Sequence, residues 1–204
     1  MVKLTLEYKH HCYHKPIMLA GGVGSIKEVH INKGTPKPGD VVIVLGGPAM
    51  LIGLGGGSAS STKKTNENSD LDFASVQRSN PEMQRRAQQV LDKFNERSSK
   101  NPITFIHDVG AGGISNAIPE LAKDTNLGVN IRLEDIYSTD DTMSPMELWC
   151  NESQERYVFS IPKEKVPALK HICERERCPF SIAGELTDDR LINVKFNNDQ
   201  IVNL

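Results

Sequence analysis

The chain has 204 residues, and its 24 lysines and arginines nearly balance 26 aspartates and glutamates, for a formal net charge of −2. This balance creates no long-range field that would attract nucleic acid or a membrane surface, so we expect neither partner. No apolar stretch approaches the roughly 18 residues that a membrane span needs. The four cysteines form no repeating framework, which favours reduced thiols and a cytoplasmic protein.

The first part of the chain has little periodicity. Residues 2–6 alternate like a strand, and residues 15–24 are an apolar stretch that runs into glycines, which predicts a strand ending in a turn. Residues 36–40 (PKPGD) are a cluster of turn formers. We therefore expect a boundary there, with residues 1–36 outside the domain and residues 37–204 forming it.

Beyond residue 40, strand and helix patterns alternate. Residues 41–45 are a continuous apolar run of the buried-strand type. A helix is expected to start at Pro81, because Asn80 is a favourable N-cap and proline is favourable at the first helical position. Its apolar residues share one helical stripe, which predicts that the helix lies on a sheet. They are Met83, Ala87, Val90, Leu91 and Phe94.

The other elements follow at similar spacing. Further strands are expected at residues 103–106, 129–133, 157–161, 180–183 and 191–194. Helices are expected at residues 115–125 and 166–177, with a helical turn at 146–149. Alternation of this kind predicts an α/β or α+β layered domain.

One candidate site is the run 106–113 (IHDVGAGG). Asp108 ends an apolar strand pattern and is followed by glycines, at the position where open α/β sheets bind ligands. A carboxylate with this much room suits Mg²⁺, which takes one or two carboxylates and completes its shell with water and phosphate oxygens. The alternative is that Asp108 caps the helix near Ser115. His107 is expected on the opposite face, as a core histidine.

A second candidate site is the run 151–156 (NESQER). Glu152, Ser153 and Gln154 offer an acceptor, a hydroxyl and an amide, which suit ribose hydroxyls or a formamide. The alternative is a polar turn in which Glu155 and Arg156 pair on the surface. Elsewhere, Gln77 precedes a helix N-terminus, where it could contact a ligand held against the positive end of the helix dipole.

A glycine-rich stretch follows the first buried strand. Gly55, Gly56, Gly57 and Ser58 are candidates for phosphate contact, because glycines let backbone N–H groups turn toward an anion. The stretch is not a Walker A loop, since no Gly-Lys-Ser/Thr follows. A merely flexible loop is the equal alternative.

Several of these runs together resemble one enzyme family, the phosphoribosylformylglycinamidine synthases in their large single-chain form. The resemblance extends from residue 13 to the C-terminus with the motifs in the same order. Its motifs are residues 14–22 (HKPIMLAGG), 45–50 (LGGPAM), 53–57 (GLGGG), 72–78 (DFASVQR), 80–83 (NPEM), 107–113 (HDVGAGG) and 151–156.

This resemblance implies an enzyme of de novo purine synthesis. Its members convert formylglycinamide ribonucleotide, ATP and glutamine to formylglycinamidine ribonucleotide, with Mg²⁺ as cofactor and ATP as co-substrate. By resemblance, Asp108 matches a magnesium-binding position, and Gln77, Glu152, Ser153 and Gln154 match substrate-contacting positions. The implied fold is the aminoimidazole ribonucleotide synthetase C-terminal-like domain, a mixed sheet covered by helices, beginning near residue 37.

The resemblance also implies that most of the enzyme is missing. Residues 1–36 would then be a tail and a remnant of the preceding synthetase N-terminal-like domain. That domain and the glutaminase domain become expected partners, the chain alone is expected to be inactive, and its truncated face could self-associate. A non-catalytic scaffold module and another ATP-using member of the superfamily are the alternatives. The first would be favoured if Asp108 and Gln77 were turned into the core.

Overall fold

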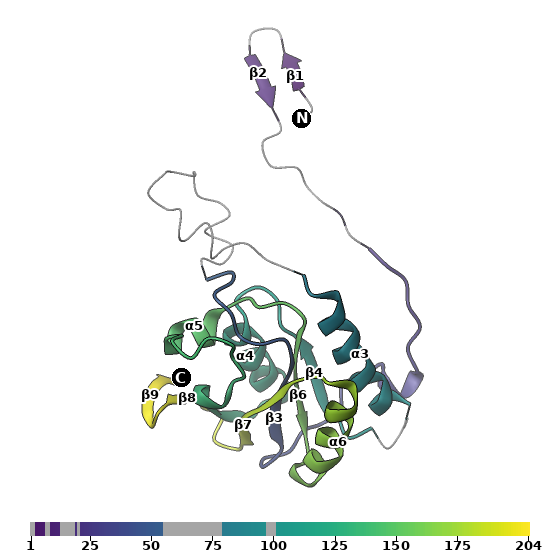
Figure 1. The fold of residues 1–204 in the computed structure, drawn as a ribbon, viewed down its shortest axis with the longest axis vertical. Coiled ribbons are helices and arrows are strands. Elements are labelled where there is room, and N and C mark those ends of the chain that lie inside the picture. Colours follow the sequence, from purple (N-terminus) through teal and green to yellow (C-terminus); the bar gives the residue numbers. More distant parts are fainter. Residues whose placement is uncertain (1–2, 7–8, 13–18, 20, 55–78, 97–100) are drawn as a thin grey trace.

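The computed structural model describes residues 3–6, 9–12, 19, 21–54, 79–96 and 101–204. In this part of the chain, seven strands form one mixed sheet that helices cover (Figure 1). The strands are β3 (Val41–Gly46), β4 (Phe105–Asp108), β5 (Gly128–Arg132), β6 (Arg156–Ile161), β7 (Phe180–Thr187), β8 (Ile192–Phe196) and β9 (Asp199–Asn203). The helices are α3 (Pro81–Asn95), α4 (Ile114–Thr125), α5 (Pro145–Cys150) and α6 (Val166–Glu176), with 3-10 turns η1 (Glu28–His30), η4 (Leu133–Asp135) and η5 (Lys163–Lys165). No helix of these described residues is long and apolar enough to cross a membrane.

The order of the sheet is β4-β6-β3-β7-β5-β8-β9, and only the β5·β8 pair is parallel. Strand β6 runs antiparallel to both of its neighbours, with Gly46 of β3 opposite Arg156 and Asp108 of β4 opposite Tyr157. The carboxyl ends of β3 and β4 and the amino end of β6 therefore meet at one edge of the sheet.

Strand β3 is buried on both faces, which explains its unbroken apolar sequence. Val41, Ile43 and Leu45 pack in one core with buried residues of α3 and α6. Val42 and Val44 face the other core, which α4 and α5 cover. The sheet is thus sandwiched between two helical layers, as the predicted α/β layered fold requires.

The start of α3 is as the sequence predicted. The Asn80 side chain accepts a hydrogen bond from the Met83 N–H at 3.0 Å, and Pro81 occupies the first turn. The buried residues of α3 are the five of the predicted stripe. The helix is thereby fixed on the sheet with its N-terminus at the edge where β3 and β4 end.

Other elements differ from the expectation. Strand β4 begins two residues later than predicted, which makes Asp108 its last residue. The predicted strand over residues 15–24 is wrong where it is described, because residues 19 and 21–24 are neither helix nor strand. The strand expected at residues 2–6 is present as β1 (Lys3–Leu6), and it pairs antiparallel with β2 (Lys9–Cys12), which was not predicted.

The last strand, β9, was not predicted. It pairs with β8 through a turn in which Asn197 and Asn198 both have positive φ, of 49° and 73°. Two consecutive residues with positive φ are typical of a type I′ hairpin turn, for which asparagine is favoured. The Asn-Asn pair was therefore a usable signal, but the polar residues of β9 gave no apolar alternation to accompany it.

We predict that Phe94→Ala lowers the free energy of unfolding by about 3–5 kcal/mol, because it removes a buried aromatic ring and leaves a cavity. Phe94 is fully buried in the core between α3, α6 and the sheet. Chemical denaturation measured by circular dichroism tests this. The control is Lys170→Ala, whose side chain is 66% exposed and should change stability by no more than about 0.5 kcal/mol. Equal effects of both changes would contradict the assignment of the core.

Candidate functional site

Four segments converge on the edge where β3 and β4 end. They are the turn after β3, the start of α3, the turn after β4, and residues 151–156, which lead from α5 into β6. The backbone of residues 151–156 joins them. The Gly47 N–H donates to Glu155 O at 3.1 Å, the Glu152 N–H to Ile52 O at 2.8 Å, and the Val109 N–H to Arg156 O at 3.1 Å.

Two glycines allow this close approach. Gly46 has φ +111°, and a Cβ placed on it would lie 2.0 Å from Glu155 O. Gly113 has φ +64°, and its Cβ would lie 2.0 Å from Asn151 O. No L side chain fits either position without moving backbone. These glycines therefore pack the turns against residues 151–156, a role that the sequence did not reveal.

The Arg156 side chain is hydrogen-bonded to the earlier residues of this run. It is only 2% exposed, and its Nη2 donates to Asn151 O at 2.9 Å and to Asn151 Oδ1 at 2.8 Å. Its Nε donates to Ser153 O at 3.2 Å. Burial lowers the pKa of Arg156 to about 10, so the guanidinium is still charged at neutral pH. A buried cation thus holds the turn in shape.

The surface pair that we considered between Glu155 and Arg156 is wrong. Glu155 has φ +58° and points to the start of α3, where its Oε1 accepts from the Asn80 N–H at 3.0 Å. Arg156, one residue later, points into the interior. Adjacent residues at a strand start face opposite ways, so sequence neighbours do not pair here.

The three predicted substrate contacts differ in their surroundings. Glu152 is 7% exposed, and its Oε1 accepts from the Gly112 N–H at 2.8 Å. Ser153 is 2% exposed, and its Oγ accepts from the Met50 N–H and donates to Asn151 Oδ1. Gln154 is half-buried and lines a cleft of about 260 Å³ together with Gly47 and the start of α3. Their role as substrate contacts stays a prediction, which the geometry favours most for Gln154.

Asp108 ends β4 with its side chain 79% exposed. It does not cap α4, whose N-cap is Gly113. It is not turned into the core either, so the condition that would favour a non-catalytic module is not met at this residue. Mg²⁺ accepts a site with one carboxylate when water and phosphate oxygens complete the shell, and the open position of Asp108 fits that mode.

The prediction that His107 is a core histidine on the face opposite Asp108 is wrong, because its Nδ1 lies 3.6 Å from Asp108 Oδ1. The His107 side chain is 25% exposed, and its Nε2 lies 2.6 Å from Glu120 Oε2 on α4. Its Nδ1 lies 2.7 Å from the backbone oxygen of Asp108. The ring therefore links the end of β4 to α4.

Some predicted positions cannot be compared. Gln77, Gly55, Gly56, Gly57 and Ser58 lie outside the described residues. Within the described residues, no three His, Cys, Asp or Glu side chains are grouped as a metal site would require. A metal at this edge would therefore depend on Asp108 together with ligand oxygens or with residues outside the described part.

Comparison with known proteins agrees with this architecture. Residues 37–197 match the family model of the AIR synthase related protein, C-terminal domain. The chain belongs to this family. The match covers strands β3 to β8 and both helical layers, and it ends in the turn before β9.

Solved structures of PurL from Thermotoga maritima share the fold. The complex with FGAR has a TM-score of 0.73 and 22% identity over 87% of this chain, and the complex with ATP has 0.67 and 21% over 85%. A structure described as phosphoribosylformylglycinamidine synthase II from the same organism has a TM-score of 0.66 and 21% identity over 85%. This chain spans only 29%, 26% and 26% of those chains, respectively.

We predict that Gly113→Ala destabilises the domain by about 2–5 kcal/mol, the sum of left-handed backbone strain and a steric clash with Asn151 O. Gly39→Ala is the matched control. Gly39 also has a positive φ, of +89°, but its Cβ would meet nothing within 4 Å, so strain alone should cost about 1–2 kcal/mol. Denaturant unfolding of both variants measures the difference. If the two substitutions cost the same, the close packing of residue 113 on residue 151 is wrong.

Proposed function

We propose that this chain is part of a phosphoribosylformylglycinamidine synthase of de novo purine synthesis. The enzyme would convert formylglycinamide ribonucleotide to formylglycinamidine ribonucleotide with ATP and glutamine, as a carbon–nitrogen ligase. Family membership and the fold shared with PurL complexes of FGAR and ATP support this. The observation that carries the proposal is the convergence of Asp108, Gln154 and the starts of α3 and α4 at one sheet edge.

The edge is suited to an anionic, oxygen-rich substrate. Helices α3 and α4 both begin there, and helix N-termini favour phosphate through free N–H groups and the helix dipole. The buried Arg156 contributes positive charge near this edge, which partly offsets the carboxylates of Glu152 and Glu155. In the proposed reaction, ATP phosphorylates the amide oxygen of the substrate and ammonia then displaces phosphate. Gln154 and Gln77 would bind the substrate, while Glu152 and Ser153 border it.

Asp108 would hold Mg²⁺. Its carboxylate is exposed, lies at the end of β4, and has the glycine turn beside it. When bound, Mg²⁺ neutralises charge on the transferring phosphoryl group. The contribution of the chain itself is to place one carboxylate oxygen near the cleft that Gln154 lines.

The complete enzyme would need further domains. A synthetase N-terminal-like domain and a glutaminase domain are the proposed partners, and residues 1–36 would belong to the former. Leu19, Val23, Ile26, Val29 and Ile31 are exposed, which suits a segment that such a domain covers or that self-associates in its absence. We therefore propose a cytoplasmic enzyme of which this chain alone binds ligand without turnover.

We predict that formylglycinamide ribonucleotide with Mg²⁺ raises the Tm of the chain more than either does alone. Stabilisation should reach about 2.7 kcal/mol at roughly a hundred times Kd. Differential scanning fluorimetry at several ligand concentrations measures the shift.

Asp108→Asn should remove the Mg²⁺-dependent part of this shift. Asp188→Asn, an exposed aspartate in the β7–β8 connection, is the control and should keep it. A well-folded wild-type chain without any shift would count against the assignment of a substrate site to this edge.

We predict that Gln154→Met weakens substrate binding about fivefold, because it removes an amide hydrogen bond worth about 1 kcal/mol while keeping the side-chain volume. Isothermal titration calorimetry measures the affinity. Gln89→Met on α3, which does not line the cleft, should bind as the wild type does. Unchanged affinity of Gln154→Met would remove Gln154 from the proposed contacts.

A further inference from the structure

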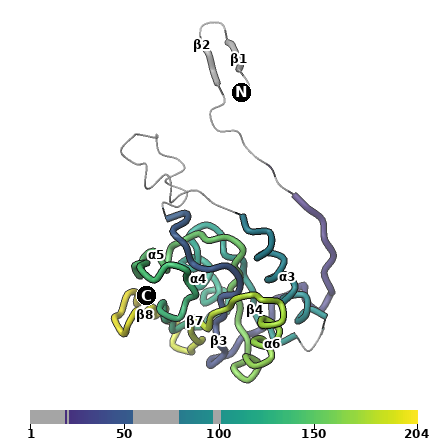
Figure 2. The backbone as a smooth tube through the Cα atoms, viewed as in Figure 1, coloured from purple at the N-terminus to yellow at the C-terminus, as the bar shows by residue number. Residues whose placement is uncertain are grey.

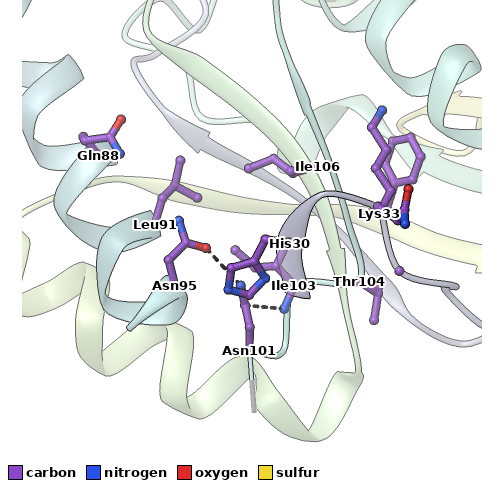
Figure 3. Close-up of a pocket in the computed structure, with 12 residues that line it drawn as sticks. His30, Lys33, Gln88, Leu91, Asn95, Asn101, Ile103, Thr104 and Ile106 are labelled. Carbon is purple, nitrogen blue, oxygen red and sulfur yellow. Dashed lines mark hydrogen bonds between the residues drawn. The ribbon is translucent and has the colours of Figure 1, made fainter. Parts of the chain in front are cut away.

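A second cavity, of about 160 Å³, lies toward the last turns of α3 and the start of β4 (Figure 3). Three separate segments build it, namely residues 30–34, the second half of α3 and residues 101–106. Figure 2 traces the first of these beside α3, and Lys27 Nζ ties it there by donating to Asn95 O at 3.0 Å. Asp108 and residues 152–154 do not line this cavity, so it is separate from the proposed substrate site.

The α3 side of the cavity combines an apolar floor with amide groups. Gln88, Leu91 and Asn95 lie on one helix face, since they are three and four residues apart. Leu91 is buried and, with Ile103, forms part of the floor. Asn95 and Gln88 are exposed at the rim, where an entering molecule would meet them.

A chain of hydrogen bonds orients these amides. Asn101 Oδ1 accepts from the Ile103 N–H at 3.0 Å, and Asn101 Nδ2 donates to Asn95 Oδ1 at 3.0 Å. The side-chain carbonyl oxygens of both asparagines therefore already accept a hydrogen bond, whereas the Asn95 amide N–H groups can donate to a ligand. Gln88 Nε2 donates to Asp92 at 2.8 Å and leaves the Gln88 carbonyl oxygen to accept.

His30 contributes a buried ring nitrogen to this cavity. Its Nε2 is buried and has no hydrogen-bond partner among the described residues. Figure 3 shows its ring beside Asn95 and Asn101, at the amide end of the cavity. Buried polar atoms in proteins are nearly always hydrogen-bonded, so this nitrogen indicates a place for a polar ligand atom.

Among the described residues, the charges around the cavity favour an uncharged ligand. Lys33 is the only charged side chain among the described lining residues, and its ammonium already lies 4.0 Å from the Phe105 ring centroid and 3.8 Å from Asp124. The nearby C-terminus of α3 carries partial negative charge, which disfavours an anion. The volume is well below the roughly 300 Å³ of typical drug-sized sites, so it holds one small ring system.

We propose that this cavity binds a purine base, with its face on the floor formed by Leu91 and Ile103 and its edge toward Asn95, Gln88 and His30. A purine has ring nitrogens that accept from amide N–H groups, and adenine has an exocyclic amine that donates to an amide oxygen. In DNA recognition a single Asn or Gln amide makes both kinds of hydrogen bond to adenine, whereas here Asn95 and Gln88, two helical turns apart, would each make one. The proposal does not depend on the function assigned to the other edge of the sheet.

The test uses adenine and the full 204-residue chain in saturation-transfer NMR, with calorimetry for affinity. We expect saturable binding that weakens at least tenfold in Asn95→Leu and also falls in Gln88→Leu. Gln89→Leu is the matched control, because Gln89 lies about 100° around the same helix and does not line the cavity.

Three results would overturn the proposal. One is the lack of saturable adenine binding by the folded wild-type chain. Another is equal affinity of wild type, Asn95→Leu and Gln88→Leu. The third is binding of nicotinamide or inorganic phosphate, lost in the same variants, when adenine does not bind.

Discussion

The backbone of residues 151–156 contacts the turns after β3 and β4. In the same run, the Glu152 side chain reaches the turn before α4, and the Glu155 side chain reaches the start of α3. Such close packing leaves space only for glycine at Gly46 and Gly113, and the guanidinium of Arg156 holds the centre of the run. Because each segment is fixed to the same short backbone, the site has little freedom to rearrange. The relative positions of Asp108, Gln154 and two helix starts follow from this one constraint.

This arrangement requires that the charged side chain of Arg156 be buried. Taking a charged guanidinium out of water is unfavourable, and in the described part of the chain its partners are backbone oxygens and one amide oxygen, with no carboxylate. The lowered pKa of Arg156 reflects that burial. The carboxylates of Glu152 and Glu155 lie in the same run, so the charge of Arg156 is not the only one at this edge. What the hydrogen bonds of Arg156 do settle is the shape of the turn.

The sequence predicted those features whose cause is local. Apolar periodicity located α3 and its buried face, and the apolar run identified β3 as a buried strand. The strand predicted over residues 15–24 is absent at residues 19 and 21–24, because an apolar, glycine-rich segment resembles a strand when no pairing partner can be seen. Strand β9 was missed because its evidence lay in a turn, at Asn197 and Asn198, and not in apolar alternation.

The sequence singled out Asp108 and residues 152–154, which the structure brings to one edge of the sheet, but it did not show the contacts that each of them makes. Glu152 and Ser153 look like surface ligands in the sequence, yet both are buried and hydrogen-bonded to backbone N–H groups of other turns. Such partners are far away in the chain, so no spacing rule could show them. Glycines that follow a strand can signal phosphate or metal contact, or simply close backbone packing. The register of β3, β4 and β6 decides between these at Gly46 and Gly113, because it brings the run 151–156 against both.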